Sequence, residues 1–134
     1  MTDIKVIHAY RHLYRGLLHA VQFSKPARFI ARDQIRAAFR ERGAKLNPRS
    51  AARTLRFLEA AAASRDLEHN ILKNLLLTSY YRRINSQTPW KIVEIALRQP
   101  RRGKDVEDHF LKLAFRHYDR TIAMLNKSMG LCLR

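Results

Sequence analysis

Four arginines recur at every fourth position in the first third of the chain, namely Arg28, Arg32, Arg36 and Arg40. In an α-helix this spacing places the four guanidinium groups in one row, beside an apolar face that includes Ile35 and Phe39. Like charges at this spacing repel by about 0.2–0.5 kcal/mol per pair, so the row does not stabilise its own helix. The pattern therefore indicates either a surface for an anionic partner or a solvated basic face, and the helix pattern alone favours neither.

A second amphipathic helix is predicted for the N-terminal segment. Its apolar stripe recurs at helical spacing and consists of Val6, Ile7, Tyr10, Leu13, Tyr14, Leu17, Leu18 and Val21. Arg11 and Arg15 fall at the edge of this stripe, next to Tyr14 and Leu18. The helix therefore presents an apolar face, a phenol and two guanidinium groups in adjacent rows.

Residue patterns for catalysis or metal binding are weak in this chain. His8 and His12 have the i,i+4 spacing of a metal pair, but no carboxylate or cysteine lies near them in sequence, which favours solvent-exposed histidines. A glycine-rich phosphate loop, a G-x-S-x-G nucleophile elbow and a Cys/His nucleophile arrangement are all missing from the sequence. We therefore expect no catalytic residues, no metal site and no small-molecule substrate.

Length and composition predict one basic domain. The chain has 134 residues, 46% of them hydrophobic, which is enough for a real core. Lysine and arginine outnumber aspartate and glutamate by 27 to 11, and the net charge of +16 favours nucleic acid, an acidic protein or an anionic membrane surface as the partner. Cys132 is the single cysteine, so we expect no disulfide framework. No sufficiently long uncharged apolar run occurs, so we expect no membrane span.

The periodicity predicts an all-α fold, because no segment shows the two-residue alternation of a strand. Helices over residues of about 3–22, 26–42 and 48–83 are expected to form an elongated three-helix core, residues 1–83. Further helices over about 89–98 and 105–129 are expected in a C-terminal helical extension, residues 84–134, packed on or beside this core within a single domain. Asn47 and Pro48 predict the start of the third helix. The apolar face of that helix shifts after Ser64, which indicates either a kink near residues 63–66 or contacts on two sides.

The combination of Leu13-Tyr14-Arg15, the following Gly16-Leu17-Leu18 and a downstream Phe39 in an arginine-rich helix resembles the LYR-motif (complex 1 LYR-like) family of small mitochondrial proteins. The resemblance covers about residues 4–80. It implies a three-helix bundle in the mitochondrial matrix that binds acyl carrier protein. It also implies that the fatty acyl chain on the carrier's phosphopantetheine inserts between the helices, while the chain itself binds no cofactor directly.

The resemblance, together with the helix patterns, assigns residues to two groups. The carrier-binding group is Arg11, Leu13, Tyr14, Arg15, Arg28, Arg32, Arg36, Phe39 and Arg40. The group expected to line the acyl chain is Leu17, Leu18, Val21, Ile35, Leu55 and Leu58. A third group of cations beyond the family core, Arg98, Arg101, Arg102 and Lys104, is expected to contact RNA or another host.

Three functions remain open from the sequence. The first is an acyl-carrier-binding adaptor that is a component or assembly factor of the mitochondrial ribosome, with ribosomal RNA and ribosomal proteins as partners. The basic excess favours this host, because one small acidic carrier needs far fewer cations than the chain has. The second is the same adaptor serving a respiratory complex or iron–sulfur delivery. The third is a stand-alone helical RNA-binding module in which the tripeptide is accidental.

Overall fold

The computed structural model describes residues 3–86 and 104–133, and all regular structure in these residues is α-helical. The described helices are α1 (Ile4–Ala20), α2 (Ala27–Arg40), α3 (Pro48–Ala63), α4 (Leu67–Ser86) and α6 (Lys104–Met129). The predicted all-α class is confirmed, whereas the helix expected over 89–98 falls outside the described residues. Among the described helices, none combines the length and apolarity needed to cross a membrane.

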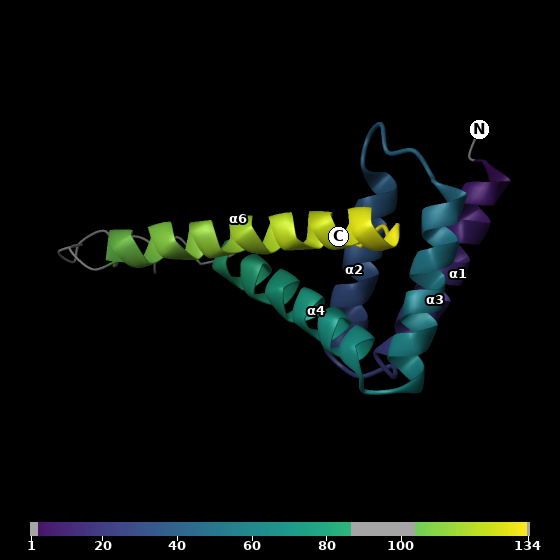
Figure 1. Cartoon of the computed structure of the whole chain (residues 1–134), viewed down its shortest axis with the longest axis horizontal. Coiled ribbons are helices and arrows are strands. Elements are labelled where there is room, and N and C mark those ends of the chain that lie inside the picture. Colours follow the sequence, from purple (N-terminus) through teal and green to yellow (C-terminus); the bar gives the residue numbers. More distant parts are fainter. Residues whose placement is uncertain (1–2, 87–103, 134) are drawn as a thin grey trace.

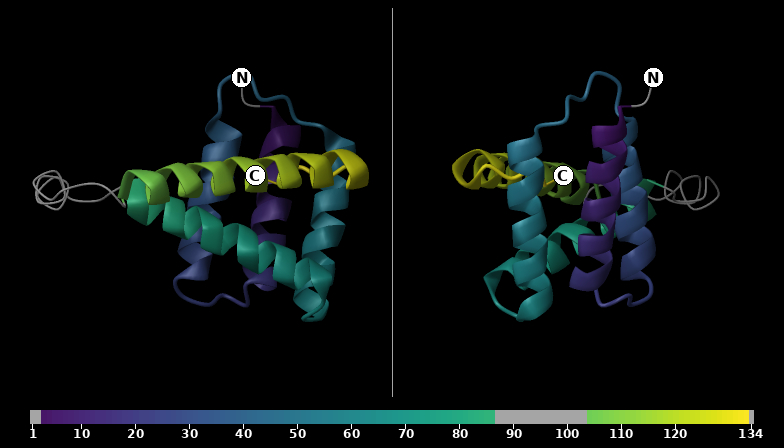
Figure 2. Two further views of the ribbon diagram at one scale, coloured as in Figure 1. Left: turned by 60° about the vertical axis from the view of Figure 1, so that its left-hand side comes forward. Right: turned by 90° about the vertical axis from the view of Figure 1, so that its right-hand side faces the viewer.

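The helices form two layers. Helices α2, α1 and α3 stand side by side with α1 in the middle, and α4 and α6 cross in front of them (Figures 1 and 2). Helix α1 packs against α2 and α3, and α4 packs against the same two helices. The core between these elements consists of Leu13, Ala20, Ala31, Ile35, Phe57, Leu58, Ala61, Leu72, Leu75, Leu76, Leu131 and Leu133.

A glycine brings α1 and α3 close together. A Cβ atom added to Gly16 would lie 2.9 Å from Leu55 Cδ1 and 3.6 Å from Leu58 Cδ1. The missing side chain at position 16 therefore makes room for two leucines of α3, which explains why a residue of poor helix propensity sits in the middle of α1.

The prediction of one continuous helix over 48–83 is wrong. The start is as predicted: the Asn47 side chain accepts hydrogen bonds from the backbone N–H groups of Arg49 (3.1 Å) and Ser50 (3.4 Å). Helix α3 ends at Ala63, because Ser64 adopts an extended conformation with φ −142° and ψ 161°. On one straight helix the apolar faces before and after Ser64 would point in different directions. The turn between α3 and α4 lets both faces reach the same core.

The last described residues fold back into the core. Gly130 has φ +66°, and the N–H of Leu131 donates to the carbonyl of Asn126 over 3.0 Å, which is the glycine-terminated helix end known as a Schellman motif. After this turn the chain carries Leu131 and Leu133 to buried positions, with 7% and 6% of their surface exposed. We call residues 130–133 the C-terminal strap.

Replacing Gly130 by alanine should destabilise the fold more than replacing Gly43 by alanine. Both glycines have positive φ, 66° and 81°, so each substitution pays the left-handed strain of about 1–2 kcal/mol. Only at Gly130 would the new Cβ also collide with the guanidinium of Arg53, whereas nothing lies within 4 Å at Gly43. Urea unfolding of the two variants measures the difference. Equal losses would show that Arg53 moves aside freely.

Candidate functional site

An apolar cavity of about 280 Å³ lies at the meeting point of α1, α2, α3, α4 and the C-terminal strap. Its apolar lining includes Val6, Leu13, Leu17, Ile35, Ala38, Phe39, Ala51, Leu58, Leu72, Leu75, Leu76 and Leu133. The loop residues 44–47 also border it, and since three of them (Ala44, Lys45 and Asn47) are exposed, the cavity reaches the surface there. Engineered apolar cavities of about 150 Å³ stay dry and bind benzene, so this space suits an apolar ligand of roughly twice that size.

The three residues of the Leu-Tyr-Arg tripeptide point in different directions, as the turn of a helix requires. Leu13 is 7% exposed and lines the cavity. The ring of Tyr14 stacks on Tyr10 with centroids 5.9 Å apart, and Tyr10 meets Phe39 of α2 edge-on at 5.3 Å. Arg15 is exposed. The tripeptide therefore links the cavity, an aromatic cluster on α1 and the solvent within one helical turn.

The arginine row runs along the outer edge of α2 that faces α1, because it flanks Phe39 and Phe39 lies against Tyr10. Arg28 and Arg32 are half-buried and lie over the ring of Phe29, 4.7 and 5.4 Å from its centroid. Exposed cations complete this surface, which we call the arginine margin: Arg11 and Arg15 on α1, and Arg36 and Arg40 on α2.

One carboxylate interrupts the charge beside this margin. Asp33 accepts hydrogen bonds from Arg83 Nη1 at 2.7 Å and from Arg32 Nη2 at 3.1 Å. The Arg83 hydrogen bond, followed by that of Arg32, lowers the pKa of the Asp33 carboxyl below its ordinary value. Asp33 therefore stays ionised and partly neutralises Arg32, which leaves the exposed arginines of the margin as the stronger attraction for an anion.

The structure divides the residues expected to line an acyl chain. Leu17, Ile35 and Leu58 border the cavity, together with Leu13 and Phe39 from the predicted carrier-binding group. The lining does not include Leu18, Val21 or Leu55. Leu55 packs on Gly16 instead, Val21 packs against the core, and Leu18 is half-buried.

Two segments of the cavity wall were not expected from the sequence, namely α4 and the strap. Helix α4 supplies Leu72, Leu75 and Leu76, and the strap supplies Cys132 and Leu133. The glycine-terminated helix end followed by Leu-Cys-Leu was the available signal for the strap, since apolar residues after such a turn commonly pack back on the helix. The leucines of α4 were not assigned to the cavity, because the shift of the apolar face after Ser64 left open a kink near residues 63–66 or contacts on two sides; the structure shows the break.

The cations expected to contact a host are mostly outside the description. Arg98, Arg101 and Arg102 fall outside residues 3–86 and 104–133, and Lys104 is described only as the first residue of α6. The structure therefore leaves this part of the prediction untested.

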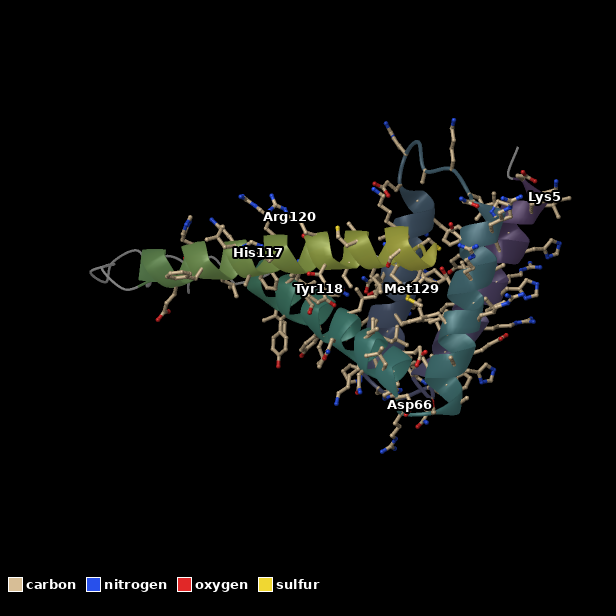
Figure 3. The ribbon with its side chains drawn as sticks, viewed as in Figure 1. Lys5, Asp66, His117, Tyr118, Arg120 and Met129 are labelled. Carbon is tan, nitrogen blue, oxygen red and sulfur yellow. The ribbon has the colours of Figure 1, made fainter. Side chains whose placement is uncertain are left out.

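A polar joint connects α4 with α6. Arg82 Nη2 donates to Asp119 Oδ1 at 2.8 Å and to the carbonyl of Phe115 at 3.1 Å, and its guanidinium lies 4.6 Å from the Phe115 ring centroid. Tyr118 points from α6 towards α4, and burial raises the pKa of its hydroxyl (Figure 3). The joint ties α6 to α4 near the point where the two helices approach each other, and α6 brings the strap to the cavity (Figure 1).

Metal chemistry finds no support in the part of the chain that the structure describes. There, no three histidine, cysteine, aspartate or glutamate side chains are grouped closely enough to hold a metal ion. His8 and His12 are both exposed on α1.

Comparison with known proteins gives one informative similarity. The chain is 37% identical over 78 residues to the UPF0593 mitochondrial protein C806.05 of Schizosaccharomyces pombe. That relative is named as a mitochondrial protein. The match covers 56% of this chain and 62% of the relative, so somewhat less than two thirds of the relative's length is spanned. No protein-family model matches the sequence, and no solved structure matches it.

Phe39→Ala should lower the free energy of unfolding by about 3 kcal/mol, because Phe39 packs against Tyr10 and forms part of the core surface. Phe29→Ala is the matched control on the same helix. Phe29 is 41% exposed and is not among the residues packed against the core, so its loss should cost less; its contacts with Arg28 and Arg32 are worth about 0.5–1 kcal/mol. Denaturant titration of both variants compares them. A neutral Phe39 variant would contradict its placement between α1 and α2.

Proposed function

We propose that this chain is a mitochondrial adaptor that binds an acylated acyl carrier protein and holds the acyl chain in the cavity. The proposal assigns no catalytic step and no directly bound cofactor to the chain. The observation that carries it is the apolar cavity of about 280 Å³, whose wall includes Leu13 of the Leu-Tyr-Arg tripeptide and Phe39 of the arginine-rich helix α2.

The cavity supplies the apolar half of the recognition. Each methylene group transferred from water into an apolar site contributes about 0.8 kcal/mol, so a chain of several methylenes gains enough to anchor a partner. The lining from Leu13 and Leu17 to Ile35 and Leu58 is aliphatic, which suits a flexible hydrocarbon better than a polar metabolite.

The arginine margin supplies the ionic half. A carrier protein of this class is acidic, and its prosthetic group contains a phosphate. Guanidinium groups form charge-assisted hydrogen bonds with both kinds of anion. Arg11, Arg15, Arg36 and Arg40 are exposed, so they are accessible to a docked partner without prior rearrangement.

The assignment to mitochondria, and within them to the matrix, rests on two supports. The first is the similarity to the mitochondrial protein of S. pombe. The second is the resemblance of residues 4–80 to the LYR-motif family, whose acyl carrier protein is a mitochondrial one.

For the host assembly we propose the mitochondrial ribosome, as a component or an assembly factor. Contact with one small acidic carrier needs far fewer cations than the 27 lysines and arginines of this chain. Exposed cations also lie away from the margin, at Arg49, Arg53 and Arg56 on α3. Phosphate contacts of such residues favour ribosomal RNA as a second partner, whereas a respiratory complex or an iron–sulfur assembly factor gives no comparable reason for the excess.

Carrier binding should require both the acyl chain and the arginine margin. When the chain is co-expressed with mitochondrial acyl carrier protein, intact mass spectrometry of the purified complex should show acylated phosphopantetheine. Arg15→Glu should weaken binding by roughly 2–5 kcal/mol, because it reverses a charge beside the tripeptide. Arg120→Glu makes the same charge change on α6, where Arg120 points away from α4, and should have little effect (Figure 3).

Two results would refute this model of binding. Equal affinity for acylated and unmodified carrier would remove the cavity from the interaction. Equal losses at Arg15 and Arg120 would mean that the attraction is diffuse electrostatics and not a sited contact.

Neutralising Arg98, Arg101, Arg102 and Lys104 together should release the protein from its large assembly while the carrier stays bound. Each lost phosphate contact should flatten the log–log salt dependence of RNA binding by about one unit. Sucrose-gradient sedimentation of mitochondrial extracts, with the carrier detected in parallel, measures both effects. If the wild type migrates with respiratory complexes and never with ribosomal particles, the ribosomal host is wrong and the respiratory alternative stands.

A further inference from the structure

We propose that the C-terminal strap sets the length of the acyl chain that the cavity accepts, with Leu133 as the residue that limits it. The inference rests on the proposed function, since it concerns the ligand of the same cavity. It adds a specificity determinant that lies more than a hundred residues after the Leu-Tyr-Arg tripeptide in sequence.

The strap forms one wall of the cavity. Leu133 is 6% exposed and lines the cavity beside Cys132, whereas Leu131 is equally buried at 7% but does not line it. The walls opposite the strap are helices that pack on one another, and Leu13 and Ile35 in these walls belong to the continuous core. The strap and the loop of residues 44–47 are the walls formed by a short segment and not by a helix, and of the two only the strap brings a buried side chain to the cavity.

Hydrogen bonds hold this wall in a defined place. Leu133 N–H donates to Asn126 Oδ1 at 2.9 Å, and Asn126 Nδ2 donates to the Leu133 carbonyl at 2.6 Å. The hydroxyl of Thr54, a residue only 6% exposed, donates to the Ser50 carbonyl at 2.7 Å and accepts from Cys132 N–H at 3.0 Å. The buried Thr54 and the half-buried Asn126 thus satisfy backbone groups of Cys132 and Leu133. The strap is therefore an ordered wall for a ligand in the cavity.

The available space then limits the chain. A cavity of about 150 Å³ holds the six carbons of benzene, so the present cavity of about 280 Å³ corresponds by proportion to about eleven carbons. A longer acyl chain has to displace the strap and break its hydrogen bonds. Truncating Leu133 removes three carbon atoms from the wall and leaves the backbone hydrogen bonds in place.

The test is the acyl composition of the carrier that co-purifies with each variant, measured by intact mass spectrometry. Leu133→Ala should shift the most abundant acyl chain towards greater length by about two carbons, the step in which fatty acyl chains grow and close to the volume removed. Leu131→Ala is the matched control, because it truncates an equally buried leucine of the same strap that does not border the cavity. It should leave the acyl composition unchanged, even if it lowers the melting temperature by as much.

The outcomes separate this inference from the proposed function. If wild type and Leu133→Ala retain carrier with the same acyl composition, the strap does not set the length, while carrier binding stands. If Leu131→Ala causes the same shift as Leu133→Ala, general loosening and not the cavity wall is responsible, and the inference is overturned. Wild type that retains no acylated carrier overturns both proposals.

A smaller truncation serves if Leu133→Ala does not fold. Leu133→Val removes one carbon and should raise the share of longer acyl chains on the carrier. An unchanged acyl composition in Leu133→Val would also overturn the role of the strap.

Discussion

The central constraint in this structure is that α1 packs against two helices of its own layer, α3 on one side and α2 on the other. On one side the absence of a side chain at Gly16 lets Leu55 and Leu58 of α3 approach. On the other side Tyr10 holds Phe39 of α2 at 5.3 Å. The two contacts set different distances between the helices, because a glycine lets two backbones approach closely whereas a pair of aromatic rings keeps them apart. The helices therefore cannot close completely around Leu13, and a cavity remains between them.

The same arrangement explains why the cavity and the cations occur together. Within the tripeptide, Leu13 is buried in the core, whereas Arg15, two residues later, is exposed to solvent. The arginine row of α2 flanks Phe39, so it is brought to the same edge by the aromatic contact. A ligand with a charged head and an apolar tail is complementary to this arrangement, because α1 and α2 each carry cavity-lining apolar residues and exposed arginines.

Patterns within single helices could be predicted from the sequence, and relations between helices could not. The spacing of apolar residues predicted the helices around Leu13 and Ile35, and Asn47 marked the start of α3. The sequence could not show that Ser64 is extended, because a shift of the apolar face fits a kink and a two-sided helix equally well. For the same reason Leu18, Val21 and Leu55 were expected at the cavity: they are apolar and near the tripeptide, but their directions depend on how closely α1 and α3 approach. Leu133 was missed because its hydrogen bonds with Asn126, and that of the neighbouring Cys132 with Thr54, depend on where α6 ends in space.

The cavity also has an energetic consequence for the unliganded chain. Cavities in protein cores cost about 24 cal/mol per Å³ compared with a filled core, so the part of this cavity that is closed to solvent lowers the stability of the unliganded chain. Domains of this size have only about 5–15 kcal/mol of total stability. A ligand that binds the folded chain and not the unfolded chain restores stability in proportion to the logarithm of its concentration over its dissociation constant. The strap offsets part of the loss by burying Leu131 and Leu133, but Leu133 still borders empty space. An apolar ligand of the kind proposed above would fill this space and bind the folded chain alone, and its binding would therefore stabilise the fold through the same cavity.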